Sequence, residues 1–174
     1  MVWNQRNKVV EHWLLGHQAR VRAVALTPDG ERAVSASDDC RLIVWNVITG
    51  AKDQILVGHS GDVNAVAVTP DGKRVVSASD DKTLKVWNLS TGELEQTLEG
   101  HTDIVMSIAA TSNGDRVISV SLDRMVKVWD LNNGKEIGNI SLNGFLYCMS
   151  LSADDSTIVV GDSVGSIYCL RLID

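Results

Sequence analysis

Short runs of apolar and polar residues, separated by turn residues, predict β-strands along this chain. Residues 63–68 (VNAVAV) are apolar and β-branched, and residues 74–79 (RVVSAS) form a second, largely apolar run. Residues 83–87 alternate polar and apolar side chains, and residues 94–98 form a more polar fourth run. No stretch has a convincing helical period. This segment therefore predicts a four-stranded antiparallel meander.

The turns between these runs carry residues that favour chain reversal. In Thr69-Pro70-Asp71-Gly72, proline presets φ at the second turn position and glycine suits the fourth. Residues 80–82 and 89–92 supply the other two turns.

The meander is copied along the chain at a step of 42 residues. Full copies cover residues 17–58, 59–100 and 101–142. A small sheet with two apolar faces needs neighbours to cover them, so the copies must stack. A 42-residue period with four strands favours a propeller blade over a solenoid coil.

The two ends of the chain hold incomplete copies. Residues 1–16 form a partial copy with a spare fourth strand at about residues 9–15. After residue 142 the step becomes 41, and residues 143–174 form a degenerate, three-stranded terminal copy. The spare strand at the head complements the strand missing at the tail. We expect residues 1–174 to form a single repeat domain.

Composition narrows the classes of partner. The 174 residues include 22 acidic and 16 basic side chains, a net charge of −6 that gives no electrostatic footprint for nucleic acid or an anionic membrane. Cys40, Cys148 and Cys169 form no CxxC pair, which indicates reduced, semi-buried thiols. No signal peptide or membrane-spanning run is visible, so a soluble cytoplasmic protein is expected. No GxxxxGK[ST] nucleotide motif is present, and no cofactor is expected.

Several motifs recur in phase with the repeat. A Gly-His pair stands at 16–17, 58–59 and 100–101, SxSxD segments follow, and VWN or VWD stands at 44–46, 86–88 and 128–130. In these motifs the chain resembles WD40 repeats over essentially its whole length, and the near-identity of adjacent copies is similar to bacterial WD40 arrays. The resemblance implies an all-β WD40 propeller of four-stranded antiparallel blades, about four per chain. It also implies a structural His-Ser-Asp-Trp tetrad in each full copy: His17, Ser35, Asp39 and Trp45; His59, Ser77, Asp81 and Trp87; His101, Ser119, Asp123 and Trp129.

The tetrads favour structure over chemistry. A buried aspartate needs donors, and an imidazole, a hydroxyl and an indole can supply and relay them. A hydrolase would need one nucleophile and one oxyanion hole at a single exposed site, whereas this trio recurs three times. The recurring histidines have no second ligand nearby, which disfavours zinc. In the last copy the tetrad positions are aliphatic, and packing alone is expected to hold that blade. These positions are Leu142, Val160, Val164 and Leu170.

The resemblance also implies a face for protein partners, built from the positions three and five after the histidine and the one before the tetrad aspartate. These are Arg20, Arg22 and Asp38; Asp62, Asn64 and Asp80; Ile104, Met106 and Leu122; and, in the last copy, Phe145, Tyr147 and Ser163. The set changes from charged to apolar along the chain. Ile104, Met106 and Phe145 would either anchor a partner or pack between blades.

Three outcomes compete for ring closure. One chain could close as four blades, two chains could exchange residues 9–15 in an eight-bladed ring, or the sequence could be a piece of a longer array. Four blades would force steep angles between sheets, and unpaired edge strands recruit other chains, so the sequence favours the homodimer. The expected function is a non-enzymatic scaffold for protein partners. The rivals are a purely architectural oligomer and an enzyme with a site in the central channel.

Overall fold

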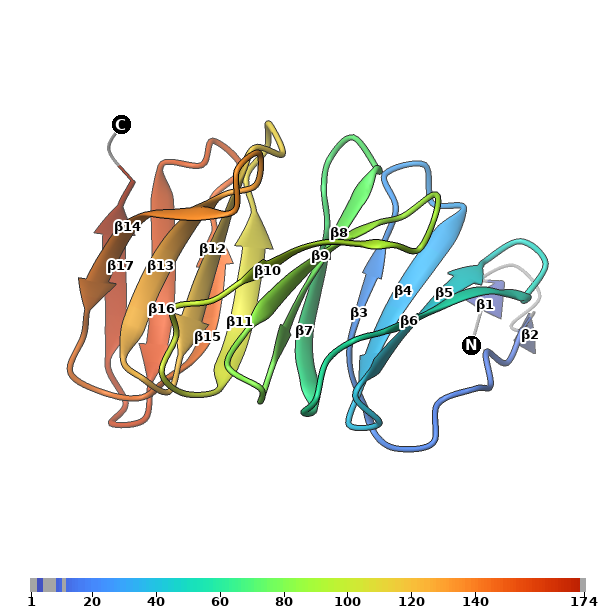
Figure 1. Ribbon diagram of the computed structural model, residues 1–174, viewed down its shortest axis with the longest axis horizontal. Helices are drawn as coiled ribbons and strands as arrows, with labels where there is room; N and C mark the ends of the chain where they lie inside the picture. Colours follow the sequence, from blue (N-terminus) through green and yellow to red (C-terminus); the bar gives the residue numbers. More distant parts are fainter. Residues whose placement is uncertain (1–2, 5–8, 11, 173–174) are drawn as a thin grey trace.

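The computed structural model describes residues 3–4, 9–10 and 12–172, and every regular element within them is a β-strand (Figure 1). Four antiparallel sheets follow one another along the chain. Blade 1 contains β3 (Val21–Leu26), β4 (Arg32–Ser37), β5 (Arg41–Asn46) and β6 (Lys52–Val57). Blade 2 contains β7 (Val63–Val68), β8 (Arg74–Ser79), β9 (Leu84–Asn88) and β10 (Leu94–Leu98). Blade 3 contains β11 (Val105–Ala110), β12 (Arg116–Ser121), β13 (Met125–Asp130) and β14 (Lys135–Ser141). Blade 4 contains β15 (Leu146–Leu151), β16 (Thr157–Asp162) and β17 (Ile167–Arg171). The predicted all-β fold of antiparallel sheets is confirmed.

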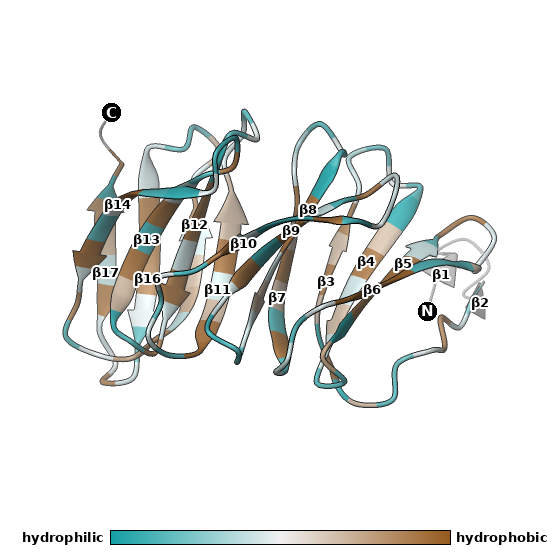
Figure 2. Ribbon diagram, in the orientation of Figure 1, coloured by the Kyte–Doolittle hydropathy of each residue, from teal (hydrophilic) through white to brown (hydrophobic). Residues whose placement is uncertain are grey.

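Each blade is apolar on both faces, and wherever two blades adjoin they cover each other's facing sides. We call the face toward the preceding blade the front face and the face toward the following blade the back face. The back face of blade 1, including Val34 and Leu42, packs with Val75 and Trp87 on the front face of blade 2 in one fully buried cluster. Two equivalent clusters join blades 2 and 3 and blades 3 and 4. Figure 2 shows the hydrophobic residues along these strands and the polar residues in the turns.

Long side chains tie the backs of blades 1 and 2 to the blade that follows each of them by hydrogen bonds. Arg74 donates to the carbonyls of Leu131 at 2.8 Å and Gly114 at 3.0 Å, and Arg32 donates to the Leu89 carbonyl. The amide of Gln96 donates to Leu131 as well, at 3.0 Å. These bonds satisfy carbonyls of the following blade and join neighbouring sheets.

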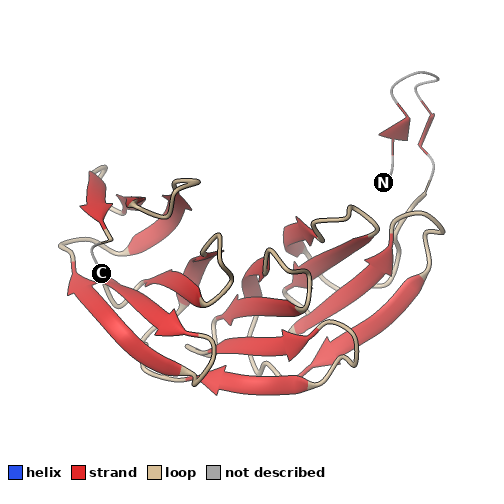
Figure 3. Ribbon diagram, turned by 90° about the horizontal axis from the view of Figure 1, so that it is seen from above, coloured by secondary structure: helices blue, strands red, loops and turns tan. Residues whose placement is uncertain are grey.

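The four blades form an open, curved row with the first and last blades at its two ends (Figure 3). On the front of blade 1, Val24 is 70% exposed and Leu26 is 62% exposed, whereas their blade 2 equivalents Val66 and Val68 pack against blade 1. On the back of blade 4, Ile167 is 77% exposed. The described chain thus offers one uncovered front face and one uncovered back face.

The cysteines differ in part from their expected burial. Cys148 and Cys169 are exposed on the back face of blade 4, and only Cys40 is partly buried. The expected semi-burial is therefore wrong for these two thiols, because no further blade covers the back face of blade 4 in the described chain.

Part of the predicted spare strand forms a short hairpin. β1 (Trp3–Asn4) pairs with β2 (Val9–Val10), with Trp3 opposite Val10. Residues 12–15 follow without regular pairing and run along the front of blade 1. The remaining positions of the predicted partial copy lie outside the described residues.

Candidate interaction face

Three full blades each assemble the four side chains of the predicted tetrad. In blade 2, His59 Nδ1 lies 2.7 Å from Asp81 Oδ2 and its Nε2 lies 2.8 Å from Ser77 Oγ, while Trp87 Nε1 donates to the same oxygen at 2.9 Å. The corresponding distances in blades 1 and 3 are 2.7–2.8 Å. The structure therefore brings together all twelve tetrad residues, blade by blade.

The tetrad is a directed chain of hydrogen bonds. An indole N–H can only donate, so Ser77 Oγ accepts from Trp87. A carboxylate can only accept, so His59 Nδ1 donates to Asp81, and Nε2 of the same ring meets the Ser77 hydroxyl. All four side chains are engaged with one another, and Ser77 is fully buried, so a substrate has no access to its hydroxyl.

The aspartate of each tetrad also holds two loops together. Asp81 accepts the backbone N–H of Ser60 through Oδ2 and that of Thr83 through Oδ1, each at 3.0 Å. Burial alone would raise the pKa of the Asp81 carboxyl, but hydrogen bonds from the His59 imidazole and the Thr83 hydroxyl keep that pKa well below its ordinary value. The charged carboxylate therefore fixes the loop before β7 against the turn after β8.

Blade 4 replaces this network with packing and one new carboxylate. Leu142, Val160 and Leu170 join the apolar cluster with blade 3, and Val164 is exposed. Asp162 takes over the turn: it accepts from the backbone N–H groups of Ser166 at 2.7 Å and Val164 at 3.0 Å, and from the Tyr168 hydroxyl. Packing alone, as expected from the sequence, is therefore an incomplete account of this blade.

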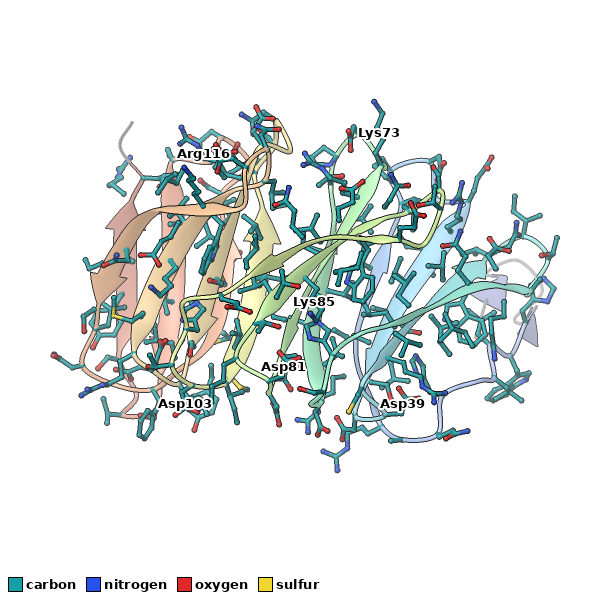
Figure 4. All side chains as sticks on the ribbon, in the orientation of Figure 1. Asp39, Lys73, Asp81, Lys85, Asp103 and Arg116 are labelled. Carbon is teal, nitrogen blue, oxygen red and sulfur yellow. The ribbon has the colours of Figure 1, made fainter. Side chains whose placement is uncertain are left out.

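One edge of the curved row gathers the positions predicted to face a partner. In every blade, the residue before the tetrad-aspartate position donates its backbone N–H to the carbonyl three residues after the histidine position. These four bonds, each 2.9 Å long, join Asp38 to Arg20, Asp80 to Asp62, Leu122 to Ile104 and Ser163 to Phe145. We call this edge the loop face; it carries Asp39, Asp81 and Asp103, opposite the edge with Lys73 and Arg116 (Figure 4).

A β-bulge aims one further side chain at the loop face in each blade. The register between the first and second strands skips a residue after Val21, Val63, Val105 and Leu146. The skipped residues are Arg22, Asn64, Met106 and Tyr147. Bulges of this kind redirect a side chain and are common at functional sites. The sequence carries a signal for it, since valine at 63, 66 and 68 breaks the two-residue period.

The chemistry of the loop face changes from blade 1 to blade 4. Arg22 forms ion pairs with Asp38 and, at 3.2 Å, with Asp62, and Asn64 donates to Asp80 at 2.7 Å. These polar side chains partner one another.

The apolar members differ in exposure. Ile104, Met106 and Leu122 are partly buried, whereas Phe145 is 50% exposed and Tyr147 is 47% exposed. Of the three residues for which the sequence left packing between blades open, Phe145 is therefore exposed in the described chain, whereas Ile104 and Met106 are partly buried.

Among the described residues, no three His, Cys, Asp or Glu side chains gather as ligands for a metal ion. Within the same ranges, no helix is long and apolar enough to cross a membrane.

Comparison with known families agrees with this architecture. The profile described as "WD domain, G-beta repeat" matches residues 8–46 and 50–88. A second profile, described as "TEP-1 C-terminal beta-propeller", matches residues 101–172. No curated protein matches the chain. Three tetrads at one spacing, antiparallel blades and these matches together place the chain in the WD40-repeat family of β-propellers.

Proposed function

We propose that this chain is a non-catalytic scaffold that binds a protein partner on the loop face of blades 3 and 4. WD40 domains generally mediate interactions between proteins, and the tetrads here are engaged in structure. The exposure of Phe145 and Tyr147 is the observation that carries the proposal. Exposed aromatic side chains on a rigid frame are the usual anchors of interfaces.

The rest of the loop face would surround these anchors. Met106 and Ile104 lie partly buried on the adjoining blade, and the charged side chains of blades 1 and 2 form a polar border. An apolar centre with a polar border is the common composition of a protein interface.

The test is selection of binding peptides from a random library. We expect enriched peptides to bind wild-type protein and to lose at least tenfold in affinity against a Phe145→Ser, Tyr147→Ser double variant. Leu94→Ser is the control, because Leu94 is also exposed but lies on β10, outside the loop face. Equal binding to all three proteins would refute the location of the site.

We further propose that two copies close an eight-bladed ring, each giving residues 9–15 as the fourth strand of the other's blade 4. The uncovered back face of blade 4 and the uncovered front face of blade 1 support this arrangement. The two segments matched by the WD40 profile begin 42 residues apart, at 8 and 50, so residues 9–15 align with β6.

Light scattering during size-exclusion chromatography measures the assembly directly. The ring predicts a particle of twice the 18.9 kDa chain mass. A particle of 18.9 kDa at all concentrations would refute the ring and leave the partner face untouched.

A further inference from the structure

A groove of about 400 Å³ lies between blades 3 and 4, on the side where β17 has no fourth strand beside it. Its lining is mostly apolar and comes from two blades: Val126, Val128, Gly138 and Ile140 of blade 3, and Leu170 and Leu172 of blade 4.

Two residue changes create this groove. In blades 2 and 3, Trp87 lies opposite Val75 and Trp129 lies opposite Val117. The equivalent position of blade 4 holds the smaller Leu170, opposite Ile158. Gly138 lies opposite Val128, where the earlier blades have Gln54 and Gln96. At the two earlier interfaces a tryptophan and a glutamine therefore occupy this space, and both are missing here.

A solvent-exposed tryptophan lies near the N-terminus of the chain, before blade 1. Trp13 is 65% exposed, which is unusual because tryptophan is a large apolar side chain that is mostly buried in folded proteins. Its neighbours hold it in this position: His12 Nε2 lies 2.9 Å from the Ile48 carbonyl, and Leu14 lies beside Trp45 on the front of blade 1.

This placement copies the fourth strand of a preceding blade. Gln54 of β6 donates to the Ser90 carbonyl of blade 2 at 3.1 Å. The contact between His12 and the Ile48 carbonyl is its equivalent, because His12 stands 42 residues before Gln54 and Ile48 stands 42 residues before Ser90. Since side chains alternate along an extended chain, His12 and Leu14 face blade 1 while Trp13 points away from it. Trp13 thus lies on the front side of this strand, which faces the blade that would precede the one completed by residues 9–15.

The strand register decides which residue Trp13 would meet. Residue 13 aligns with Ile55, which lies opposite Ile43. Ile43 of blade 1 and Tyr168 of blade 4 occupy equivalent positions, because Ile43 lies opposite Ser35 and Tyr168 lies opposite Val160. Residues 9–15 paired with β17 would therefore place Trp13 opposite Tyr168. Tyr168 and Leu170 share the front face of blade 4, and a diagonal neighbour at this spacing is within reach of an indole.

We propose that the groove between blades 3 and 4 is the receptor for Trp13 of a second copy of this chain. The inference rests on the proposed ring and identifies the contact that holds it. Trp13 and Tyr168 form an aromatic cross-strand pair, replacing the polar Lys85–Thr97 pair of blade 2. The indole covers Val128 and Leu170 and supplies the apolar bulk that blade 4 lacks.

The test compares dimer dissociation constants by sedimentation. Trp13→Ala should raise the constant at least about 30-fold, because buried aromatic anchors are the main contributors to interfaces. Gly138→Gln restores the glutamine of the earlier blades and fills the groove from within the chain. A Cβ at Gly138 meets only Val128 carbons at 3.9 Å, so the variant should fold and weaken the dimer by at least tenfold. Leu94→Ala is the control and should leave the constant unchanged.

The outcomes separate this inference from the ring itself. Weakening by both Trp13→Ala and Gly138→Gln, with Leu94→Ala neutral, supports it. A wild-type dimer that neither variant weakens would overturn the role of Trp13 while the ring stands. A wild-type protein that is monomeric at every concentration would overturn both.

Discussion

Trp87→Leu tests whether the tetrad and its tryptophan stabilise the junction of blades 1 and 2. Trp87 is 1% exposed, and the substitution gives blade 2 the residue that blade 4 carries as Leu170. Trp87 also packs closely on the chain: an added Cβ at Gly58 would lie 3.0 Å from its ring. Backbone on one side and buried valines on the other leave little room for the structure to close over the lost volume.

The expected cost has two parts. Truncating a buried tryptophan to alanine costs about 3–5 kcal/mol, and leucine retains roughly half of that apolar contact, which leaves about 2 kcal/mol. The Ser77 oxygen loses its indole donor in a fully buried position, which adds about 1 kcal/mol. The free energy of unfolding should therefore fall by about 3 kcal/mol.

Urea unfolding followed by circular dichroism at low protein concentration measures this difference. Trp13→Leu is the matched control, because the same substitution at a 65% exposed position should change the free energy by less than about 0.5 kcal/mol. Equal effects of the two substitutions would show that the buried tryptophan contributes no more than an exposed one, and the reasoning would be wrong.

Three further predictions concern acid, inter-blade bonds and thiols. Burial keeps the pKa of His101 below its ordinary 6.5 despite the neighbouring Asp123, so the unfolded chain takes up that proton first and the Tm should fall as the pH drops from about 7 to 5. The carboxyl pKa values of Asp39, Asp81 and Asp123 are also lowered, so the free energy of unfolding should decrease further as the pH falls below 3.8, the ordinary pKa of an aspartate carboxyl. A Tm that stays constant from about pH 7 to 3 would contradict the predictions for both His101 and the aspartates. Arg74→Lys should cost about 1 kcal/mol in urea unfolding, since an ammonium cannot reach the Leu131 and Gly114 carbonyls together, and an unchanged midpoint would argue against that bridge. In the proposed ring, alkylation of Cys148 and Cys169 should slow at least tenfold as concentration rises while that of Cys40 stays constant, and equal rates would exclude burial of the blade 4 back face.

The strand pattern could be predicted well because each blade repeats the same local signals. The strands expected at 63–68 and 74–79 coincide with β7 and β8, and the third strand begins one residue later than expected, at Leu84. Apolar runs and turn residues are properties of neighbouring positions, and they are sufficient to define these elements.

What the sequence left open depends on contacts between distant residues. Whether Phe145 packs between blades or faces solvent is decided by how blade 4 sits on blade 3. Asp162 replaces a lost tetrad from the position of the second serine in the SxSxD segment, which is not a tetrad position. The bulge at Tyr147 changes the direction of its side chain without changing the strand's composition.

The hairpin at the head of the chain bears directly on ring closure. β1 pairs with β2 through Trp3 and Val10, in the register that joins Trp45 to Lys52 in blade 1, so β1 occupies the third-strand position beside the spare strand. In the proposed ring, β17 of the second copy takes that same edge of β2 to complete blade 4, and one strand edge cannot pair with both. In that ring β1 therefore competes with β17 for β2. A ladder of two residue pairs is marginal by itself, whereas β17 offers five residues on an apolar sheet, so the exchange favours the longer strand. Because residues 12–15 are already held against blade 1, Trp13 can dock before the hairpin opens, and the competition then affects the rate of closure more than the stability of the closed ring.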